Sequence, residues 1–236
     1  MRMTTPELVK LVQELTPDFL RGLDAGILGD IVEAADYESF PANLTILSQG
    51  SPARRLMLLL RGQARITFTT EAGQRLVLRW IPVGRVLGWA ALLPDACDYF
   101  TSTETAEECR TLTWDHATIR RLATAHPRLW QNAFEIMGSG FGGFLTDHAS
   151  QSCDTAPQRL ARVLFSLAEV FGRRTPHGIE VKIKNEDLAH AANVTLFTAS
   201  RQINEWQRDG FLAKSRGKIV LHSAEALLLH AVDNVG

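Results

Sequence analysis

The chain is 236 residues long, with 45% hydrophobic residues, 22% charged residues and a formal net charge of −1. This composition is typical of a globular protein with one large or two modest domains, and it excludes a wholly basic nucleic-acid-binding chain. No apolar run approaches the roughly 20 residues of a membrane helix, and the first residues lack the apolar segment of a secretion signal, so we expect a cytoplasmic protein without a membrane partner.

Two regions with different patterns follow one another at the start of the chain. Residues 6–35 carry apolar side chains at helical spacing, which predicts helices. Residues 37–114 show short apolar runs separated by glycine or proline, which predicts strands. Ala64, Ile66 and Phe68 alternate with polar neighbours, the period-two pattern of a half-buried strand.

The loop TEAGQ at residues 70–74 lies between two of these runs. It predicts a hairpin in which Gly73 takes a positive φ. Many short strands at regular intervals are typical of an antiparallel roll or barrel. We therefore expect a β-roll over this part of the chain.

Helical patterns return at Asp115, whose side chain is placed to cap the next helix. Pro127 divides a short helix from a longer one that runs toward Gln151. Residues 152–158, which read SCDTAPQ, predict a hinge, and a helix with one apolar stripe follows it. The stripe comprises Leu160, Val163, Leu164, Leu167 and Phe171. A short strand is then expected over residues 179–183.

Within the long predicted helix, residues 138–143 read GSGFGG and match G-x-G-x-x-G, the fingerprint of a dinucleotide-binding turn. That motif holds a pyrophosphate only where a strand enters it and a helix leaves it. The preceding residues, LWQNAFEIM, have a helical pattern, so we do not expect NAD binding. Because no paired acid–base groups and no nucleophile motif accompany the glycines, we do not expect an enzyme.

Residues 184–221 predict a helix-turn-helix followed by a hairpin. Asn193 and Val194 turn the chain between two helices, and Thr195 can cap the second one. The residues expected to face inward are Leu188, Ala191, Ala192, Ala199, Ile203 and Trp206. The hairpin has Gly217 at its turn.

Cations surround this segment. They are Arg201, Arg208, Lys214, Arg216 and Lys218. A recognition helix can enter the major groove of DNA while the cations of a following wing neutralise phosphates. We therefore favour DNA binding over a ligand-binding module whose helix pair contacts another protein, and a salt titration of DNA binding separates the two.

From about Leu20 to Leu229 the chain resembles the bacterial Crp/Fnr regulators, the family of the cyclic-AMP receptor protein and the fumarate–nitrate regulator. The motif TASRQI resembles the core of that family's recognition helix, and VGRVLGWAALLP resembles its phosphate-binding cassette. The resemblance implies an α+β fold: an antiparallel β-roll sensor of the cyclic-nucleotide-binding jelly-roll type over residues 1–125, a dimerisation helix over 126–152 and a winged helix-turn-helix over 153–236. The GSGFGG stretch would lie on the dimerisation helix, where small residues let paired helices approach closely or leave room beside a ligand.

The resemblance also implies an effector pocket, and this chain departs from the family there. Relatives that bind cyclic AMP carry a Gly-Glu pair and, about a dozen residues later, an Arg-Ser pair. Here the two positions hold Gly88-Trp89 and Tyr99-Phe100, which offer the cyclic phosphate no ionic partner, so we do not expect cyclic AMP. The residues expected at the pocket are Gly88, Trp89, Ala90, Tyr99, Phe100, Phe141 and Phe144.

Three alternatives remain for that pocket. It holds a flat apolar ligand or haem, as in gas-sensing relatives, it is filled by its own side chains, or it binds another metabolite. Candidate axial ligands for haem are His116, His126, His148, Cys97 and Cys109. The amino-terminal cysteine cluster of iron–sulfur relatives is absent, because no cysteine precedes Cys97, and the odd number of cysteines without a C-x-x-C pair predicts neither disulfides nor a zinc site.

The recognition helix departs from the family as well. Relatives commonly read DNA with a glutamate at the position of Phe197, whereas Ser200 and Arg201 match the family's later pair. Arg201 can bind guanine O6 and N7, and Leu196 and Phe197 can contact thymine methyl groups. The residues expected to contact DNA are Thr195, Leu196, Phe197, Thr198, Ser200, Arg201, Asn204, Lys214, Arg216 and Lys218.

Together these features predict a homodimeric, sequence-specific transcription regulator that binds a twofold-symmetric operator in double-stranded DNA. A shift in the dimerisation helices would re-aim the recognition helices, so regulation would be allosteric. The expected partners are a second copy of the chain, operator DNA, RNA polymerase and a small-molecule effector of unknown chemistry.

Overall fold

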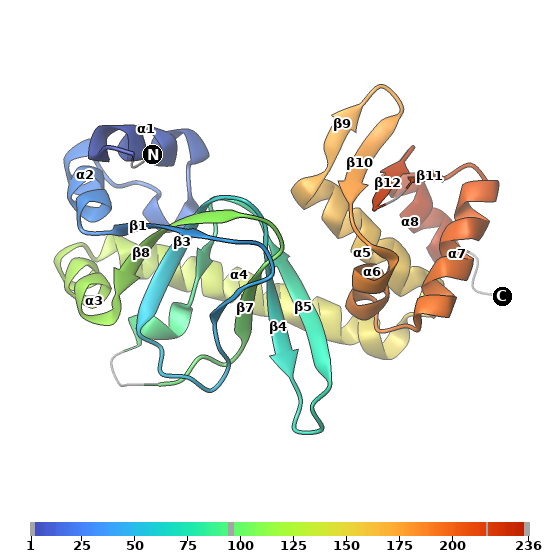
Figure 1. The fold of residues 1–236 in the computed structure, drawn as a ribbon, viewed down its shortest axis with the longest axis horizontal. Helices are drawn as coiled ribbons and strands as arrows, with labels where there is room; N and C mark the ends of the chain where they lie inside the picture. Colours follow the sequence, from blue (N-terminus) through green and yellow to red (C-terminus); the bar gives the residue numbers. More distant parts are fainter. Residues whose placement is uncertain (1–2, 94–96, 216, 234–236) are drawn as a thin grey trace. The chain divides into compact units, whose positions relative to one another are not determined.

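The computed structural model describes residues 3–93, 97–215 and 217–233. The chain divides into two compact units, Met1–Gly142 and Gly143–Gly236, and the boundary falls inside helix α4 (Arg128–Cys153). The sequence predicts this helix as a segment of its own, and Figure 1 labels it α4. Among the described residues, no helix combines the length and the hydropathy needed to cross a bilayer.

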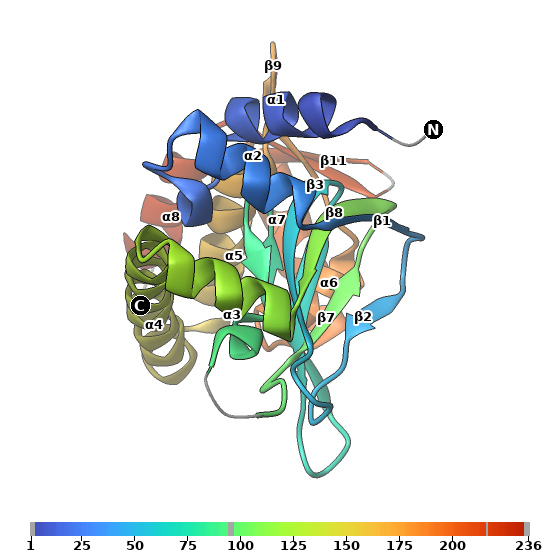
Figure 2. The ribbon, with the colours of Figure 1, turned by 90° about the vertical axis from the view of Figure 1, so that its left-hand side faces the viewer.

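The first unit starts with helices α1 (Thr5–Leu15), η1 (Asp18–Leu20) and α2 (Ala25–Glu33), as the apolar spacing predicts. Thr4 and Glu7 form a capping box at α1. At α2 the Asp24 side chain accepts a hydrogen bond of 2.9 Å from the Ile27 amide. Figure 2 shows α1 and α2 side by side, next to strands of the roll. These caps explain why the helices begin where they do.

The predicted antiparallel roll is confirmed, with two four-stranded sheets among the described residues of the first unit. One sheet has the order β1-β8-β3-β6 and the other β2-β7-β4-β5. The strands are β1 (Asp36–Phe40), β2 (Thr45–Leu47), β3 (Arg55–Arg61), β4 (Ala64–Thr69), β5 (Arg75–Ile81), β6 (Val86–Leu87), β7 (Ser102–Thr105) and β8 (Cys109–Asp115). Strands β6 and β7 have no apolar run long enough to predict them. The hairpin between β4 and β5 turns at Gly73 with φ of +77°, as expected.

The regular alternation predicted for β4 is interrupted. The register shifts between Ile66 and Thr67 in the pairing with β5. Thr67 is buried, while Phe68 is only half-buried. Ile66 pairs with Arg79 and Thr67 with Val77, so the extra residue of this β-bulge is Leu78 of β5. The pairing of β4 with β7 keeps its register, so the bulge does not exchange the two faces of β4.

Strand β3 separates two hydrophobic cores because both of its faces are buried. Leu56 and Leu58 pack against the helices of the first unit, together with Trp114, whose indole N–H donates to the carbonyl of Ile31 over 2.8 Å. Met57 packs on the opposite side, in the interior of the roll. Because side chains of a strand alternate, one continuous apolar run supplies both cores.

The helices that follow the roll match their predicted boundaries. Asp115 caps α3 (His116–Ala125) by accepting a 2.8 Å hydrogen bond from the Thr118 amide, and Pro127 separates α3 from α4. Asn132 anchors α4 to the first unit, since its side-chain amide donates to the carbonyl oxygens of Phe19 and Arg21, each over 2.9 Å. Residues 138–143 are helical, so the strand-turn-helix context of a dinucleotide site is not formed.

The second unit contains the winged helix-turn-helix that the sequence predicts. Its elements are α5 (Ala156–Phe171), β9 (Arg173–Thr175), β10 (Gly178–Lys182), α6 (Asn185–Ala191), α7 (Leu196–Arg208), β11 (Leu212–Ser215), β12 (Lys218–Leu221) and α8 (Ala224–Asp233). The wing strands β11 and β12 join β10 and β9 in one antiparallel sheet. The apolar stripe of α5 packs against α8, α6 and α7. Strand β9 was not predicted, because its residues are polar.

Candidate nucleic-acid interface and sensor site

Local hydrogen bonds set the geometry of the turn between α6 and α7. Asn193 takes a left-handed φ of +50°, and the Val194 amide donates to the carbonyl of Ala189 over 3.0 Å. Thr195 caps α7 by accepting a 3.1 Å hydrogen bond from the Thr198 amide. Leu188, Ala192 and the inward face of α7 are buried as predicted, whereas Ala191 is half-buried.

Helix α7 has a buried face and an exposed face. The buried residues are Ala199, Gln202, Ile203 and Trp206. Phe197, Arg201, Asn204 and Arg208 recur every three or four residues on the exposed face. The Phe197 side chain is 78% exposed and Leu196 is 52% exposed. Helix α7 thus displays two large apolar residues and two arginines at its surface. These residues suit a partner that offers both charged and apolar groups, such as DNA with its phosphates and the thymine methyl groups of the major groove.

The wing contributes cations of two kinds. Lys214 has no ion-pair partner among the described residues. Lys218 instead lies 3.5 Å from the Glu180 carboxylate, which also pairs with Arg173 over 3.1 Å. Arg216 lies outside the described residues. Lys214 and Lys218 are both predicted to contact DNA. The structure gives them different charge environments.

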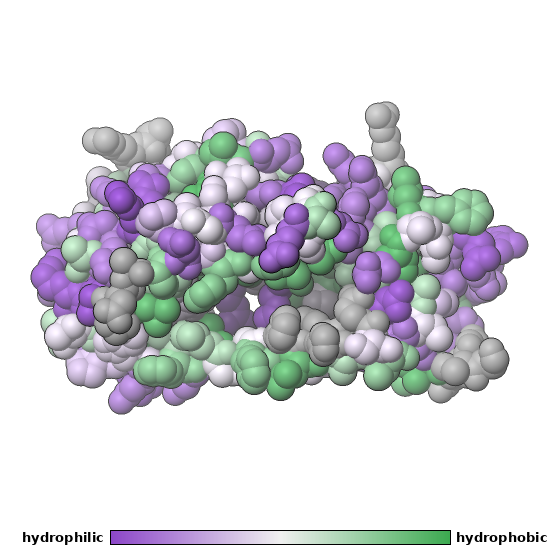
Figure 3. Space-filling view, turned by 90° about the horizontal axis from the view of Figure 1, so that it is seen from below, coloured by the Kyte–Doolittle hydropathy of each residue, from purple (hydrophilic) through white to green (hydrophobic). Residues whose placement is uncertain are grey.

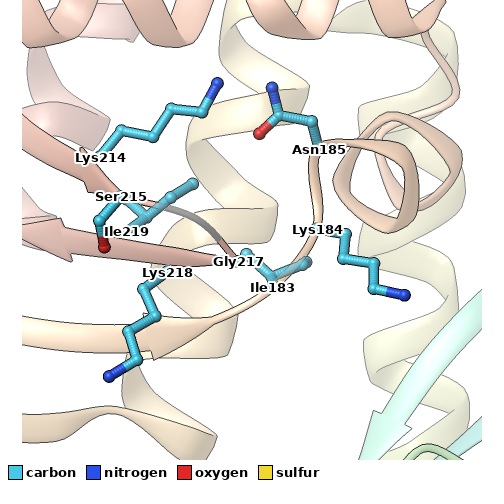
Figure 4. Close-up of a pocket in the computed structure, with 8 residues that line it drawn as sticks. All are labelled: Ile183, Lys184, Asn185, Lys214, Ser215, Gly217, Lys218 and Ile219. Carbon is cyan, nitrogen blue, oxygen red and sulfur yellow. The ribbon is translucent and has the colours of Figure 1, made fainter.

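A hollow of about 460 Å³ opens between the wing and the start of α6. It is lined by Ile183, Lys184, Asn185, Lys214, Ser215, Gly217, Lys218 and Ile219. In Figure 4, Lys214 and Asn185 point toward each other across the hollow, while Lys184 and Lys218 point away from it. Of the described residues that line the hollow, none carries a carboxylate. Such a site favours an anion.

Sequence reasoning missed Asn185. Its side-chain amide donates a 3.1 Å hydrogen bond to the hydroxyl of Ser200, one of the predicted DNA contacts. The two residues are 15 positions apart and on different helices, so no helical spacing relates them. The only signal in the sequence was that Lys184 and Asn185 immediately precede the predicted helix.

In the first unit, Gly88, Ala90 and Tyr99 lie together. Gly88 takes φ of +79°, and a Cβ atom there would approach the Arg55 carbonyl oxygen to 2.5 Å, so only glycine fits. The Tyr99 hydroxyl accepts from the Arg55 amide over 2.9 Å and donates to the Arg55 carbonyl over 2.8 Å. Burial of this phenol raises the pKa of Tyr99. Gly88 of the cassette and the Tyr99 side chain thus both lie against the β3 backbone at Arg55.

The remaining pocket residues do not gather around these three. Trp89, in η2 (Trp89–Leu92), packs edge-on against Phe19 with ring centroids 5.5 Å apart, in the core beneath the helices. Trp89 and its neighbour Ala90 in the short helix therefore pack against different hydrophobic clusters, and Tyr99 belongs to the cluster of Ala90. Phe100 and Phe141 are exposed, and Phe144 lies outside the residues whose side chains are described.

The candidate axial ligands are spread over the first unit. The His116 ring nitrogen Nδ1 lies 2.8 Å from the Ala91 carbonyl oxygen. The Cys109 thiol donates to the backbone carbonyl of Gln63 over 3.3 Å. Burial raises the pKa of Cys109, which disfavours the thiolate that iron prefers. Cys97 donates to the Ala90 carbonyl over 3.4 Å, His126 ends α3, and the side chain of His148 is not described. Among the described residues, no three histidine, cysteine or acidic side chains form a metal-binding group.

The predicted hinge between α4 and α5 is held by several contacts. Asp154 accepts a 2.6 Å hydrogen bond from Ser150 and one of 2.5 Å from Arg162. Arg159 donates to the Asp154 carbonyl over 2.6 Å and to the Ala192 carbonyl over 2.9 Å. Partial burial raises the pKa of Asp154, but the hydrogen bond from Ser150 and the charge of Arg162 outweigh it, so the pKa lies below its usual value. The end of α4 is thereby linked to the turn of the helix-turn-helix.

Comparison with known protein families assigns both parts of the chain. Residues 37–126 match the cyclic nucleotide-binding domain, and residues 158–229 match the Crp-like helix-turn-helix domain. The two matches cover the roll and the winged helix-turn-helix, in the order that the fold shows.

Individual relatives extend over nearly the whole chain. It is 18% identical over 213 residues to the CRP-like cAMP-activated global transcriptional regulator of Mycobacterium tuberculosis. The aligned residues cover 89% of this chain and 95% of that protein. It is 23% identical over 205 residues to the global nitrogen regulator of Synechocystis, with 85% and 90% covered. The solved structure of the c-di-GMP-responsive global regulator CLP of Xanthomonas campestris matches with a TM-score of 0.75 and 18% identity, over 85% of this chain and all of that one, which shows a common fold.

Proposed function

The chain belongs to the Crp/Fnr family of DNA-binding transcription regulators, and on that premise we propose that two copies of it bind one twofold-symmetric operator. In this proposal the α7 helix of each copy enters the major groove, and the wings flank it. Half-sites would then be centred about 34 Å apart, one helical turn of DNA. RNA polymerase is the expected partner of the bound dimer.

The proposal that this surface binds DNA rests on one observation: the exposed face of α7 lies beside the anion-favouring hollow. Arg201 is exposed and has no carboxylate partner among the described residues, so its guanidinium is free to bind a base edge in the bidentate manner. The stripe Phe197, Arg201, Asn204 faces outward as one surface. Lys214 adds a free cation for the DNA backbone.

A binding-site selection followed by salt titration tests this surface. We expect a preferred half-site with a guanine opposite Arg201, and affinity that falls steeply with salt. Arg201→Ala should cost about 1–3 kcal/mol and relax the preference at that guanine. Arg121→Ala removes the same charge from the first unit and serves as the control. An unchanged preference in Arg201→Ala contradicts the assignment, and weak, salt-independent binding favours a protein partner instead.

Apolar residues on α4 support the homodimer. The exposed stripe consists of Phe134, Met137, Phe141 and Leu145, spaced by three or four residues. Phe134 is 67% exposed and Phe141 is 62% exposed, which is unusual for side chains of this size in a chain that acts alone. Figure 3 shows that apolar side chains also lie at the surface, among hydrophilic ones. A second copy of α4 is the proposed occupant.

The glycines of α4 support close pairing of the two helices. Beyond the neighbouring residues and the helix backbone, a Cβ atom added at Gly138 or Gly142 would meet no atom of the described residues within 4 Å, so packing among them does not require glycine there. Each interior glycine costs a helix about 1 kcal/mol relative to alanine. Sedimentation of the double variant Phe134→Glu, Phe141→Glu tests the pairing, with Ser139→Glu, off the stripe, as the control. We expect a monomer for the double variant only.

The sensor site supports an effector other than cyclic AMP. The relatives' names mention different cyclic nucleotides, cAMP in one and c-di-GMP in another. In this chain Trp89 packs on Phe19, and Tyr99 bonds to the backbone of Arg55, so neither offers a charge to a cyclic phosphate. Titration calorimetry with cyclic AMP should show no binding. The visible spectrum of the purified protein decides the haem alternative, because bound haem gives a Soret band.

A further inference from the structure

Asn185 belongs to two parts of the proposed DNA-binding surface. One N–H of its side-chain amide donates to the Ser200 hydroxyl over 3.1 Å, and the same side chain lines the hollow opposite Lys214 (Figure 4). We infer that Asn185 is a positioning residue for base readout, which holds Ser200 as a hydrogen-bond donor while its second N–H binds a DNA phosphate in the hollow. This inference rests on the proposed function.

The chemistry of a hydroxyl explains the first role. A serine hydroxyl rotates freely, and it can either donate its proton or accept one. When Asn185 donates to the Ser200 oxygen, the hydroxyl proton turns away from Asn185. Ser200 lies on the same turn as Arg201 and next to the exposed stripe of α7. Its proton is thereby directed to acceptors of the major groove, namely guanine O6 or N7, adenine N7 and thymine O4, and not to the cytosine amine.

The hollow explains the second role. A primary amide has two N–H groups, and only one of them is used by Ser200. The hollow of about 460 Å³ brings Asn185 and Lys214 to face each other, and none of its described lining residues is acidic. A phosphate of the DNA backbone placed there can accept from the amide while the lysine neutralises its charge. One side chain thus links backbone contact to base contact.

The fold itself does not require this hydrogen bond. Helices α6 and α7 pack through buried apolar side chains, chiefly Leu188, Ala189, Ala199 and Ile203. Lys184, not Asn185, is the N-cap of α6. A role in readout therefore explains the Asn185–Ser200 contact better than a role in stability.

The test compares Asn185→Ala, Asn185→Asp, Ser200→Ala and the double variant Asn185→Ala, Ser200→Ala. The probes are duplexes of the selected operator in which each base pair of the half-site is varied in turn. We expect Asn185→Ala to weaken binding to the preferred duplex roughly tenfold. It should also reduce the preference among bases at the base pair that Ser200 contacts. In the Ser200→Ala background, Asn185→Ala should weaken all duplexes evenly and leave their ranking unchanged.

Asn185→Asp gives the sharper result. The aspartate carboxylate has the same shape as the asparagine amide, but it only accepts hydrogen bonds. The carboxylate accepts a hydrogen bond from the Ser200 hydroxyl, so the serine oxygen then offers its lone pairs to the DNA. The preference at that position should move toward bases with a donor on this edge, cytosine N4 or adenine N6. Overall affinity should also fall, because a negative charge then faces the phosphate.

Two outcomes overturn the inference. They are additive effects of Asn185→Ala and Ser200→Ala on base preference, and an unchanged preference in Asn185→Asp. Wild-type binding and the Arg201→Ala loss, measured in the same assay, show separately whether the proposed function stands. Thermal unfolding of each variant guards against misfolding, and the isosteric Asn185→Asp supplies the answer if Asn185→Ala is unstable.

Discussion

Trp89 in the first unit and Phe197 in the second stand where the family resemblance places glutamate, yet their surroundings are opposite. Trp89 is half-buried and packs against Phe19 and the core cluster, whereas Phe197 is 78% exposed at the start of α7. Under that resemblance, an aromatic residue takes the place of glutamate once against a core and once on an exposed helix face. A family position therefore does not fix a residue's role, because the role depends on whether the local backbone points the side chain inward or outward.

Restoring glutamate in the roll is expected to have the largest effect. Trp89→Glu would place a carboxylate against Phe19 and the apolar core, and we expect it to lower the free energy of unfolding by about 3 kcal/mol. Chemical unfolding of the variant measures the loss, and Trp89→Phe, which keeps an aromatic ring, is the control. Full stability together with new cyclic AMP binding would show that Trp89 lies in a pocket and would remove the contrast with Phe197.

Restoring glutamate in α7 should change recognition and leave stability alone. The Phe197 side chain is largely exposed, so Phe197→Glu should alter the free energy of unfolding by less than about 0.5 kcal/mol. A glutamate accepts from the cytosine amine, so selection with the variant should move one position from thymine toward cytosine, with a discrimination of about 1–3 kcal/mol. Phe197→Ala separates loss of the apolar contact from gain of the new one. A large loss of stability would contradict the exposed placement.

The two wing lysines refine the comparison within the second unit. Lys214→Ala should weaken DNA binding by about 1 kcal/mol on every sequence and reduce the slope of log affinity against log salt by about 1. Lys218→Ala should have a smaller effect, because its cation already lies 3.5 Å from the Glu180 carboxylate. Binding measured at several salt concentrations checks the order. Equal effects of the two substitutions would mean that the ion pair with Glu180 breaks when DNA binds.

Acid should act on the second unit through Asp154. Because the pKa of Asp154 is lower in the folded chain, its contribution to stability is complete above the ordinary aspartate pKa and is lost as pH falls through the lower folded value. Asp154→Asn should remove that part of the pH dependence, about 0.5 kcal/mol after allowance for solvent. Unfolding of the wild type and variant at neutral and acidic pH measures it. Identical pH profiles would exclude Asp154 as the source.

Most of the fold was predictable because its signals are local. Caps at Asp115 and Thr195, the turn at Gly73 and the break at Pro127 depend on residues within about four positions of each other. Strands β1, β6, β7 and β9 were not, because they are short or lack an apolar run and their sheet partners hold them in place. The bulge at Leu78 of β5 likewise depends on pairing with a neighbouring strand.

For the candidate sites, the sequence by itself determined which residue types stand on α7, in the wing and in the cassette, since helical spacing and motif order can be read along the chain. Only the tertiary structure decided that Trp89 enters a core, that Lys218 meets Glu180 and that Asn185 reaches Ser200. The physical reason is that each of these contacts joins residues distant in sequence, and their separation in space is set by the packing of whole helices and strands.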